Sequence, residues 1–179
     1  MGENDPTGER GPPMSAVSQR GVPAGRAVSA ALVFVVAVAF VAVLGSLATG
    51  SSTQSYLAMQ QPSWAPPPWL FGPVWTVLYV IIAFAGWRFW TTSGPLDRAR
   101  PELSIYAIGL VLNGLWTPLF FALELPVAAL VDIVVLDVAI VATMIAFARR
   151  DRLAGWVLLP YLAWTLFATA LNGAIVVLN

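Results

Sequence analysis

The chain has 179 residues, of which 59% are hydrophobic and 10% are charged. A soluble domain carries about 25% charged residues, so this composition leaves too little polar surface for a protein that water covers. Nine arginines balance nine acidic residues, and the chain has no cysteine and no histidine. Disulfides are therefore excluded, and zinc, haem or iron–sulfur sites lack their usual ligands. We expect no metal site, no cofactor and no nucleic-acid partner.

Two regions of different composition follow one another along the chain. Residues 1–25 are rich in Gly, Pro, Ser and charge and predict a disordered N-terminal arm. Residues 26–179 contain five apolar runs, each near the ~20 residues that cross a ~30 Å hydrocarbon core. The runs are about 27–49, 70–90, 103–123, 126–148 and 153–178. The first is longer than the ~7–15 apolar residues of a secretory signal peptide, which favours a membrane span.

Each run must satisfy its backbone hydrogen bonds internally, which predicts helices. The fold class is therefore an all-α integral membrane protein with a bundle of five transmembrane helices. Pro126 stands where the fourth helix would begin, a position where a missing N–H costs nothing. Pro118 and Pro160 lie within the third and fifth runs, and we expect each to kink its helix.

The arginines predict the orientation of the bundle. They lie before the first run, around the loop between the second and third, and between the fourth and fifth, whereas the other polar segments contain none. They are Arg10, Arg20, Arg26, Arg88, Arg98, Arg100, Arg149, Arg150 and Arg152. By the positive-inside rule the N-terminus is cytoplasmic and the C-terminus is external.

Polar and aromatic residues form stripes in the outer half of the predicted bundle. Helical spacing places them on single faces. The stripes are Trp75 and Tyr79; Gly109, Asn113 and Trp116; and Trp164, Ala168 and Asn172. Together they predict an aromatic-walled cavity that opens to the outside, although each residue alone is equally consistent with ordinary helix packing.

Two carboxylates lie within the fourth run, where a charged group is costly and usually functional. Asp132 is near the outer end, and Asp137 is near the middle. They are five residues apart, about 140° around a helix, so they do not form an acid pair. We expect Asp137 to find a hydrogen-bond partner inside the bundle or across a dimer seam, and Asp132 to lie near the cavity.

The external segment 50–72 is the predicted lid of the cavity. Five prolines between residues 60 and 75 hold this stretch extended, and Trp64 and Trp69 stand on it. A rigid lid with tryptophans over an aromatic cavity suits a flat, apolar, partly anionic ligand.

Several blocks of this sequence resemble the TspO/MBR family, the tryptophan-rich sensory proteins and translocator proteins. The blocks are PSWAPPPW (62–69), GPVWTVLY (72–79), LNGLWTPLFF (112–121), ALVDIVVL (129–136) and PYLAWTLFATALN (160–172). The resemblance implies a five-helix bundle, often a homodimer, that binds porphyrins such as protoporphyrin IX. The ligand-binding residues carried over are Trp64, Trp75, Tyr79, Asn113, Trp116, Asp132, Trp164, Ala168 and Asn172.

The sequence also departs from the family pattern. Residues 171–179 lack the Tyr and the basic residue of the cholesterol-recognition pattern, so we do not expect cholesterol binding. Ala128 stands where the animal proteins have a tryptophan, and Asp137 belongs to no matching motif.

Three functions remain open. The favoured hypothesis is a membrane receptor, sensor or transporter that binds a tetrapyrrole under the 50–72 loop. The alternative is an enzyme that degrades porphyrin with light and oxygen, in which the resemblance points to Trp64 and Trp164. No other catalytic residues are indicated. A membrane scaffold without a ligand is the third hypothesis.

Overall fold

The structure is a computed structural model that describes residues 22–50, 53–93 and 96–179, and these residues contain helices and no strand. The long helices are α1 (Ala24–Gly50), α3 (Phe71–Thr92), α4 (Leu96–Thr117), α5 (Pro126–Ala148) and α7 (Leu159–Leu178). The short ones are α2 (Thr53–Ala58), η1 (Pro68–Leu70), η2 (Pro118–Ala122) and α6 (Arg152–Trp156). Of the predicted arm, residues 1–21 lie outside the described residues.

Within the described residues, five helical stretches are long and apolar enough to cross a membrane. They are Ala24–Ala48, Pro68–Thr92, Ala99–Ala122, Pro126–Ala148 and Arg152–Leu178. Their ends agree with the predicted runs to within about one helical turn. The predicted five-helix membrane bundle is therefore confirmed.

Two of the predicted proline positions interrupt their helices. Pro118 opens η2, a π-helical turn in which the Leu123 N–H donates to the Pro118 carbonyl at 2.9 Å. Pro160 is the second residue of α7 and follows a break at Val157 and Leu158. Because proline has no N–H, it cannot continue the hydrogen-bond ladder of the preceding turn.

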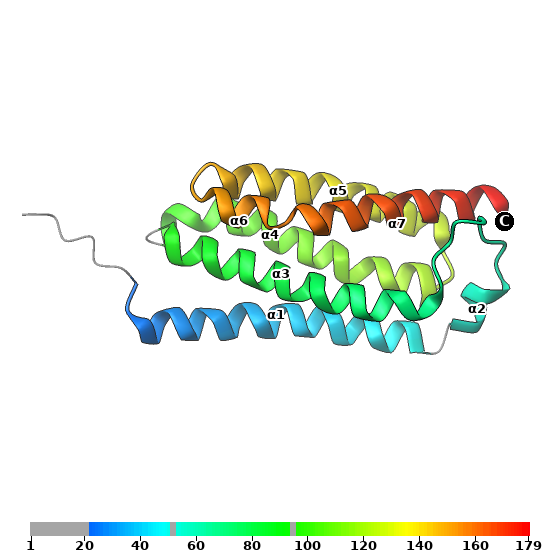
Figure 1. The fold of residues 1–179 in the computed structure, drawn as a ribbon, viewed down its shortest axis with the longest axis horizontal. Coiled ribbons are helices and arrows are strands. Elements are labelled where there is room, and N and C mark those ends of the chain that lie inside the picture. The colour runs from blue at the N-terminus through cyan, green and yellow to red at the C-terminus, as the bar shows by residue number, and fades with distance from the viewer. Residues whose placement is uncertain (1–21, 51–52, 94–95) are drawn as a thin grey trace, which may run out of the picture.

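Figure 1 shows the long helices running side by side, with α1 against α3 and α4, and with α5 against α4 and α7. The described arginines gather at the end where α3 and α5 finish and α4 and α6 begin. There Arg88 pairs with Asp151 at 3.1 Å, and Arg150 pairs with Glu102 at 2.6 Å. We call this the arginine end. The C-terminus and α2 lie at the opposite end.

The interior near the arginine end is filled by aromatic rings. Phe89 and Phe147 stack with centroids 3.9 Å apart, and both side chains are fully buried. Tyr106 packs on Phe147 and donates its hydroxyl to the Ile82 carbonyl at 3.0 Å. This half of the bundle is a packed core.

Candidate functional site

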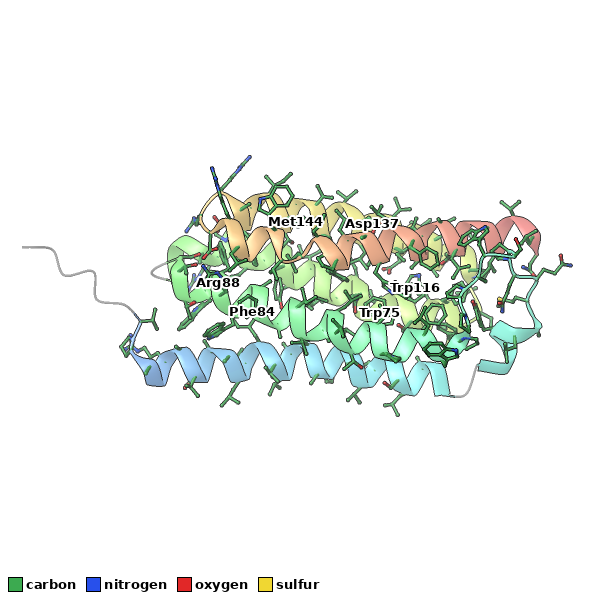
Figure 2. All side chains as sticks on the ribbon, in the orientation of Figure 1. Trp75, Phe84, Arg88, Trp116, Asp137 and Met144 are labelled. Carbon is green, nitrogen blue, oxygen red and sulfur yellow. The ribbon has the colours of Figure 1, made fainter. Side chains whose placement is uncertain are left out.

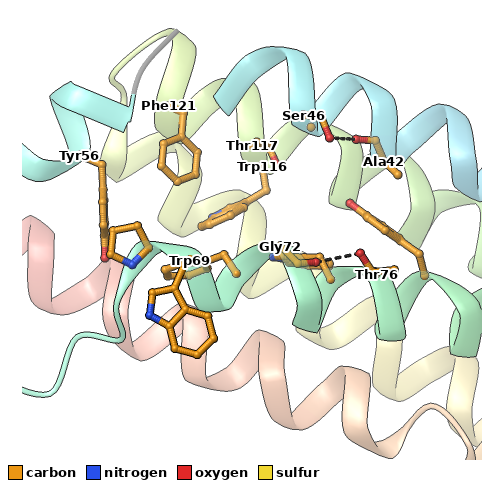
Figure 3. A pocket seen from close by; sticks show the side chains of 14 residues that line it. Ala42, Ser46, Tyr56, Trp69, Gly72, Thr76, Trp116, Thr117 and Phe121 are labelled. Atoms are coloured by element: carbon orange, nitrogen blue, oxygen red, sulfur yellow. Dashed lines mark hydrogen bonds between the residues drawn. The ribbon is translucent and has the colours of Figure 1, made fainter. Parts of the chain in front are cut away.

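A cavity of about 660 Å³ lies between α1, α3 and the α4–η2 segment, near the end opposite the arginines (Figure 3). Seven aromatic side chains line it: Tyr56, Trp69, Phe71, Trp75, Tyr79, Trp116 and Phe121. Figure 2 places Trp75 and Trp116 well away from Arg88 along the bundle. Among the described residues, no charged side chain lines the cavity.

The α1 wall of the cavity consists of small residues. Ala42, Gly45 and Ser46 line it, and their spacing places them on one face of the helix. A Cβ atom at Gly45 would lie 3.5 Å from Thr117 Oγ1 and 3.8 Å from the Tyr79 hydroxyl. The missing side chain therefore leaves room that faces the other two walls. This wall was not predicted, although small residues at helical spacing in a Val-rich run could have indicated it.

Two of the five hydroxyl groups of the lining are bonded to their own helices. Ser46 Oγ donates to the Ala42 carbonyl at 3.0 Å, and Thr76 Oγ1 donates to the Gly72 carbonyl at 2.9 Å. Figure 3 shows both bonds at the edge of the cavity. The hydroxyl groups of Tyr56, Tyr79 and Thr117 also belong to the lining, which otherwise consists mainly of rings and aliphatic carbon.

The α3 wall contains the predicted pair Trp75 and Tyr79, whose ring centroids are 5.4 Å apart. The Tyr161 ring of α7 packs against the Trp75 ring in a T-shaped contact, with centroids 6.3 Å apart. The Tyr161 hydroxyl accepts a bond of 3.0 Å from Asn113 Nδ2. Asn113 does not line the cavity. Its amide instead holds the Tyr161 ring that packs against Trp75.

The α4 wall is Trp116, and Asn172 holds it in place. Trp116 Nε1 donates to Asn172 Oδ1 at 3.3 Å, and Asn172 Nδ2 donates to the Pro126 carbonyl at 2.8 Å. One buried amide thus ties α4, α5 and α7 together behind the cavity. Ala168, one turn away on α7, is buried and does not line the cavity.

The predicted tryptophans Trp64 and Trp164 lie outside this cavity. The ring centroids of Trp64 and Phe167 are 5.7 Å apart. The ring centroid of Trp164 lies 5.4 Å from that of Phe167 and 5.9 Å from that of Phe71. Trp164 lines a separate groove of about 590 Å³ between α3 and α7. Phe71 also lines the main cavity, so one ring contacts Trp164 and forms part of the cavity wall.

The lid segment is tied at Gln60 to Asn179, which follows α7. The Gln60 N–H donates to Asn179 Oδ1 at 2.9 Å, and Asn179 Nδ2 donates to the Gln60 carbonyl at 3.1 Å. Just before α3, Trp69 lines the cavity, and 71% of its surface is exposed. The exposed indole stands at the mouth.

Neither carboxylate of α5 lines the cavity. Asp137 Oδ2 accepts a bond of 2.7 Å from Thr169 Oγ1, so its partner lies inside the bundle. Asp132 is half-buried, and its Oδ2 has no hydrogen-bond partner among the described residues. The described part of the chain holds no group of three or more His, Cys, Asp or Glu that could bind a metal.

Residues 32–178 match the sequence model of the TspO/MBR family. The tryptophan-rich protein TspO of Archaeoglobus fulgidus is 41% identical over 146 residues, which are 81% of this chain and 94% of that protein. TspO of Chlorobaculum tepidum is 43% identical over 124 residues, 69% of this chain and 78% of the relative. The human translocator protein is 38% identical over 124 residues, 69% and 73% of the two chains. The chain therefore belongs to the TspO/MBR family.

Proposed function

We propose that this TspO/MBR-family membrane protein binds a tetrapyrrole of the protoporphyrin IX type in the aromatic cavity, as a receptor, sensor or transporter. The observation that carries the proposal is the cavity itself, with seven aromatic rings opposite a wall of small residues. Its volume of about 660 Å³ lies within the ~300–1,000 Å³ of small-molecule sites. A flat macrocycle gains both apolar contact and ring stacking in such a site.

The chemistry of the lining also indicates how the ligand is oriented. A porphyrin of this type carries two carboxylates on one edge, and no charged residue in the described part of the chain lines the cavity to neutralise them. A buried, unpaired carboxylate is costly, so this edge points to the mouth, where Trp69 is exposed. The apolar edge then lies against Trp75 and Trp116.

We propose that the N-terminus faces the cytoplasm, because the described arginines share one end of the bundle and positive loops stay inside. The mouth of the cavity then opens on the external side. A fluorescent-protein or phosphatase fusion at Asn179 tests this, and a cytoplasmic reporter signal would reverse the assignment. The family resemblance also supports a homodimer, which crosslinking in the native membrane tests.

Titration with protoporphyrin IX, followed by its absorbance, tests binding. We expect saturation at micromolar concentration, which corresponds to a binding free energy of about −8 kcal/mol. Trp116→Ala removes a large contact surface, worth about 1–3 kcal/mol, so the dissociation constant should rise about tenfold or more. Trp156→Ala is the control, because Trp156 is 61% exposed near the arginines. Equal affinity of both variants, or no saturable binding by the parent, would contradict the proposal and favour a scaffold.

The positions of Trp64 and Trp164 favour binding over light-dependent breakdown in this cavity, since neither tryptophan lines it. Illumination of the complex in air distinguishes the two functions. Loss of porphyrin absorbance in the parent but not in Trp164→Phe would support the enzymatic alternative.

A further inference from the structure

A further groove lies beside α5, near the arginine end. It is a groove of about 420 Å³ between α5 and the α6–α7 segment. Val141, Ile145 and Leu162 form much of its apolar wall, while Arg149 and Trp156 also line it. Figure 2 shows Met144, another lining residue, towards the end where Arg88 lies.

The groove results from the way α6 meets α5. A Cβ atom at Gly155 would lie 2.6 Å from the Met144 carbonyl oxygen and 2.7 Å from the Ala148 nitrogen, so the two backbones touch there. The helix then breaks at Val157 and Leu158 before α7 begins. Close contact at Gly155, followed by this break, leaves an apolar gap beside α5.

One cation at the groove has no ion pair among the described residues. Arg88 and Arg150 form ion pairs with Asp151 and Glu102. Arg149 is exposed, lines the groove, and has no ion pair among the described residues. A guanidinium without a counter-ion next to an apolar groove indicates a ligand with an anionic head and an apolar tail.

We propose that this groove binds one anionic phospholipid, with its phosphate at Arg149 and the start of an acyl chain along Val141 and Ile145. The wall from Val141 to Ala148 is about 10 Å long, which is too short to seat a ~30 Å spanning helix but suits part of an acyl chain. Trp156 is 61% exposed and occupies the interface position that tryptophan prefers. Basic residues at this depth attract anionic headgroups.

Native mass spectrometry of the whole purified protein tests the site. Phosphatidylglycerol and phosphatidylcholine with identical acyl chains are added at equal concentration. We expect one phosphatidylglycerol to be retained in preference to phosphatidylcholine. Arg149→Gln should lower this retention about fivefold, the effect of about 1 kcal/mol per basic residue, and Arg149→Lys should keep most of it.

Arg26→Gln is the matched control, because Arg26 is also exposed and has no ion pair among the described residues, but lies on α1. It should retain phosphatidylglycerol as the parent does. Val141→Trp, at a position 40% exposed, should fill the groove and lower retention with every arginine intact. Equal retention of the two lipids, or equal loss in Arg26→Gln and Arg149→Gln, would overturn the site. Displacement by millimolar glycerol phosphate would show an anion site without a lipid requirement and would also overturn it.

Discussion

Asn172→Ala tests whether one buried amide holds the wall of the cavity. Asn172 is 1% exposed, accepts from Trp116 Nε1, and donates to the Pro126 carbonyl. The substitution leaves the indole N–H without its partner inside the protein. It also removes the donor that ties α7 to the first residue of α5.

The expected loss of stability follows from these two bonds. A hydrogen bond between membrane helices contributes about 0.6 kcal/mol on average and about 1.7 at most. Removing both, together with the small loss of packed volume, should lower the free energy of unfolding by about 1–3 kcal/mol. Trp116 should also become more mobile, so protoporphyrin IX should bind more weakly.

The assay is unfolding with sodium dodecyl sulfate in mixed micelles, followed by far-ultraviolet circular dichroism. Thr165→Val is the control, since Thr165 is fully buried but donates only to the Leu162 carbonyl of its own helix. Its loss leaves no group between helices unpaired, and we expect a change below about 1 kcal/mol. An Asn172→Ala variant as stable as Thr165→Val would refute the role of the amide.

Two further predictions concern the arginine end. Gly155→Ala should cost about 1–3 kcal/mol in the same assay, because its Cβ would meet the Met144 carbonyl oxygen and the Ala148 nitrogen; unchanged stability would contradict the close contact. Burial alone would raise the pKa of the Asp151 carboxyl, but bonds from the Ala154 N–H and the Arg88 guanidinium hold this pKa below its usual 3.8. Because the pKa of this carboxyl is lower in the folded than in the unfolded protein, its ionised form stabilises the fold at pH values above the unfolded pKa. The free energy of unfolding should therefore fall as the pH drops below about 4. Asp151→Asn should show a smaller fall, and an identical pH profile would contradict the assignment.

The five spans were predictable because each run combines length with apolar composition, and a bilayer leaves helices as the way to satisfy such a backbone. Pro126 marked the start of α5 for the same local reason. It was harder to predict which surface each helix face packs against. Helical spacing places Ala168 and Asn172 on one face of α7, but it does not say that this face packs into the core rather than onto the cavity.

The location of the cavity depends on contacts between helices that are distant in sequence. Trp75, Tyr79 and Trp116 were predicted and do line it. The Gly45 wall was not predicted, because α1 is apolar all round and its pattern does not show which face meets α3 and α4. The ligand roles of all the predicted residues remain predictions until binding is measured.

Filling the cavity from α1 tests most directly whether it is the tetrapyrrole site. A leucine at Gly45 would extend from a Cβ position 3.5 Å from Thr117 Oγ1 into the cavity, whereas a Cβ atom at Gly25 on the same helix would have no atom within 4 Å. The measurement is the dissociation constant of protoporphyrin IX, compared between variants of equal stability. We predict that Gly45→Leu raises it about tenfold or more, about 1.4 kcal/mol, and that Gly25→Leu leaves it unchanged. A folded Gly45→Leu variant that binds as tightly as the parent would contradict the assignment of this cavity.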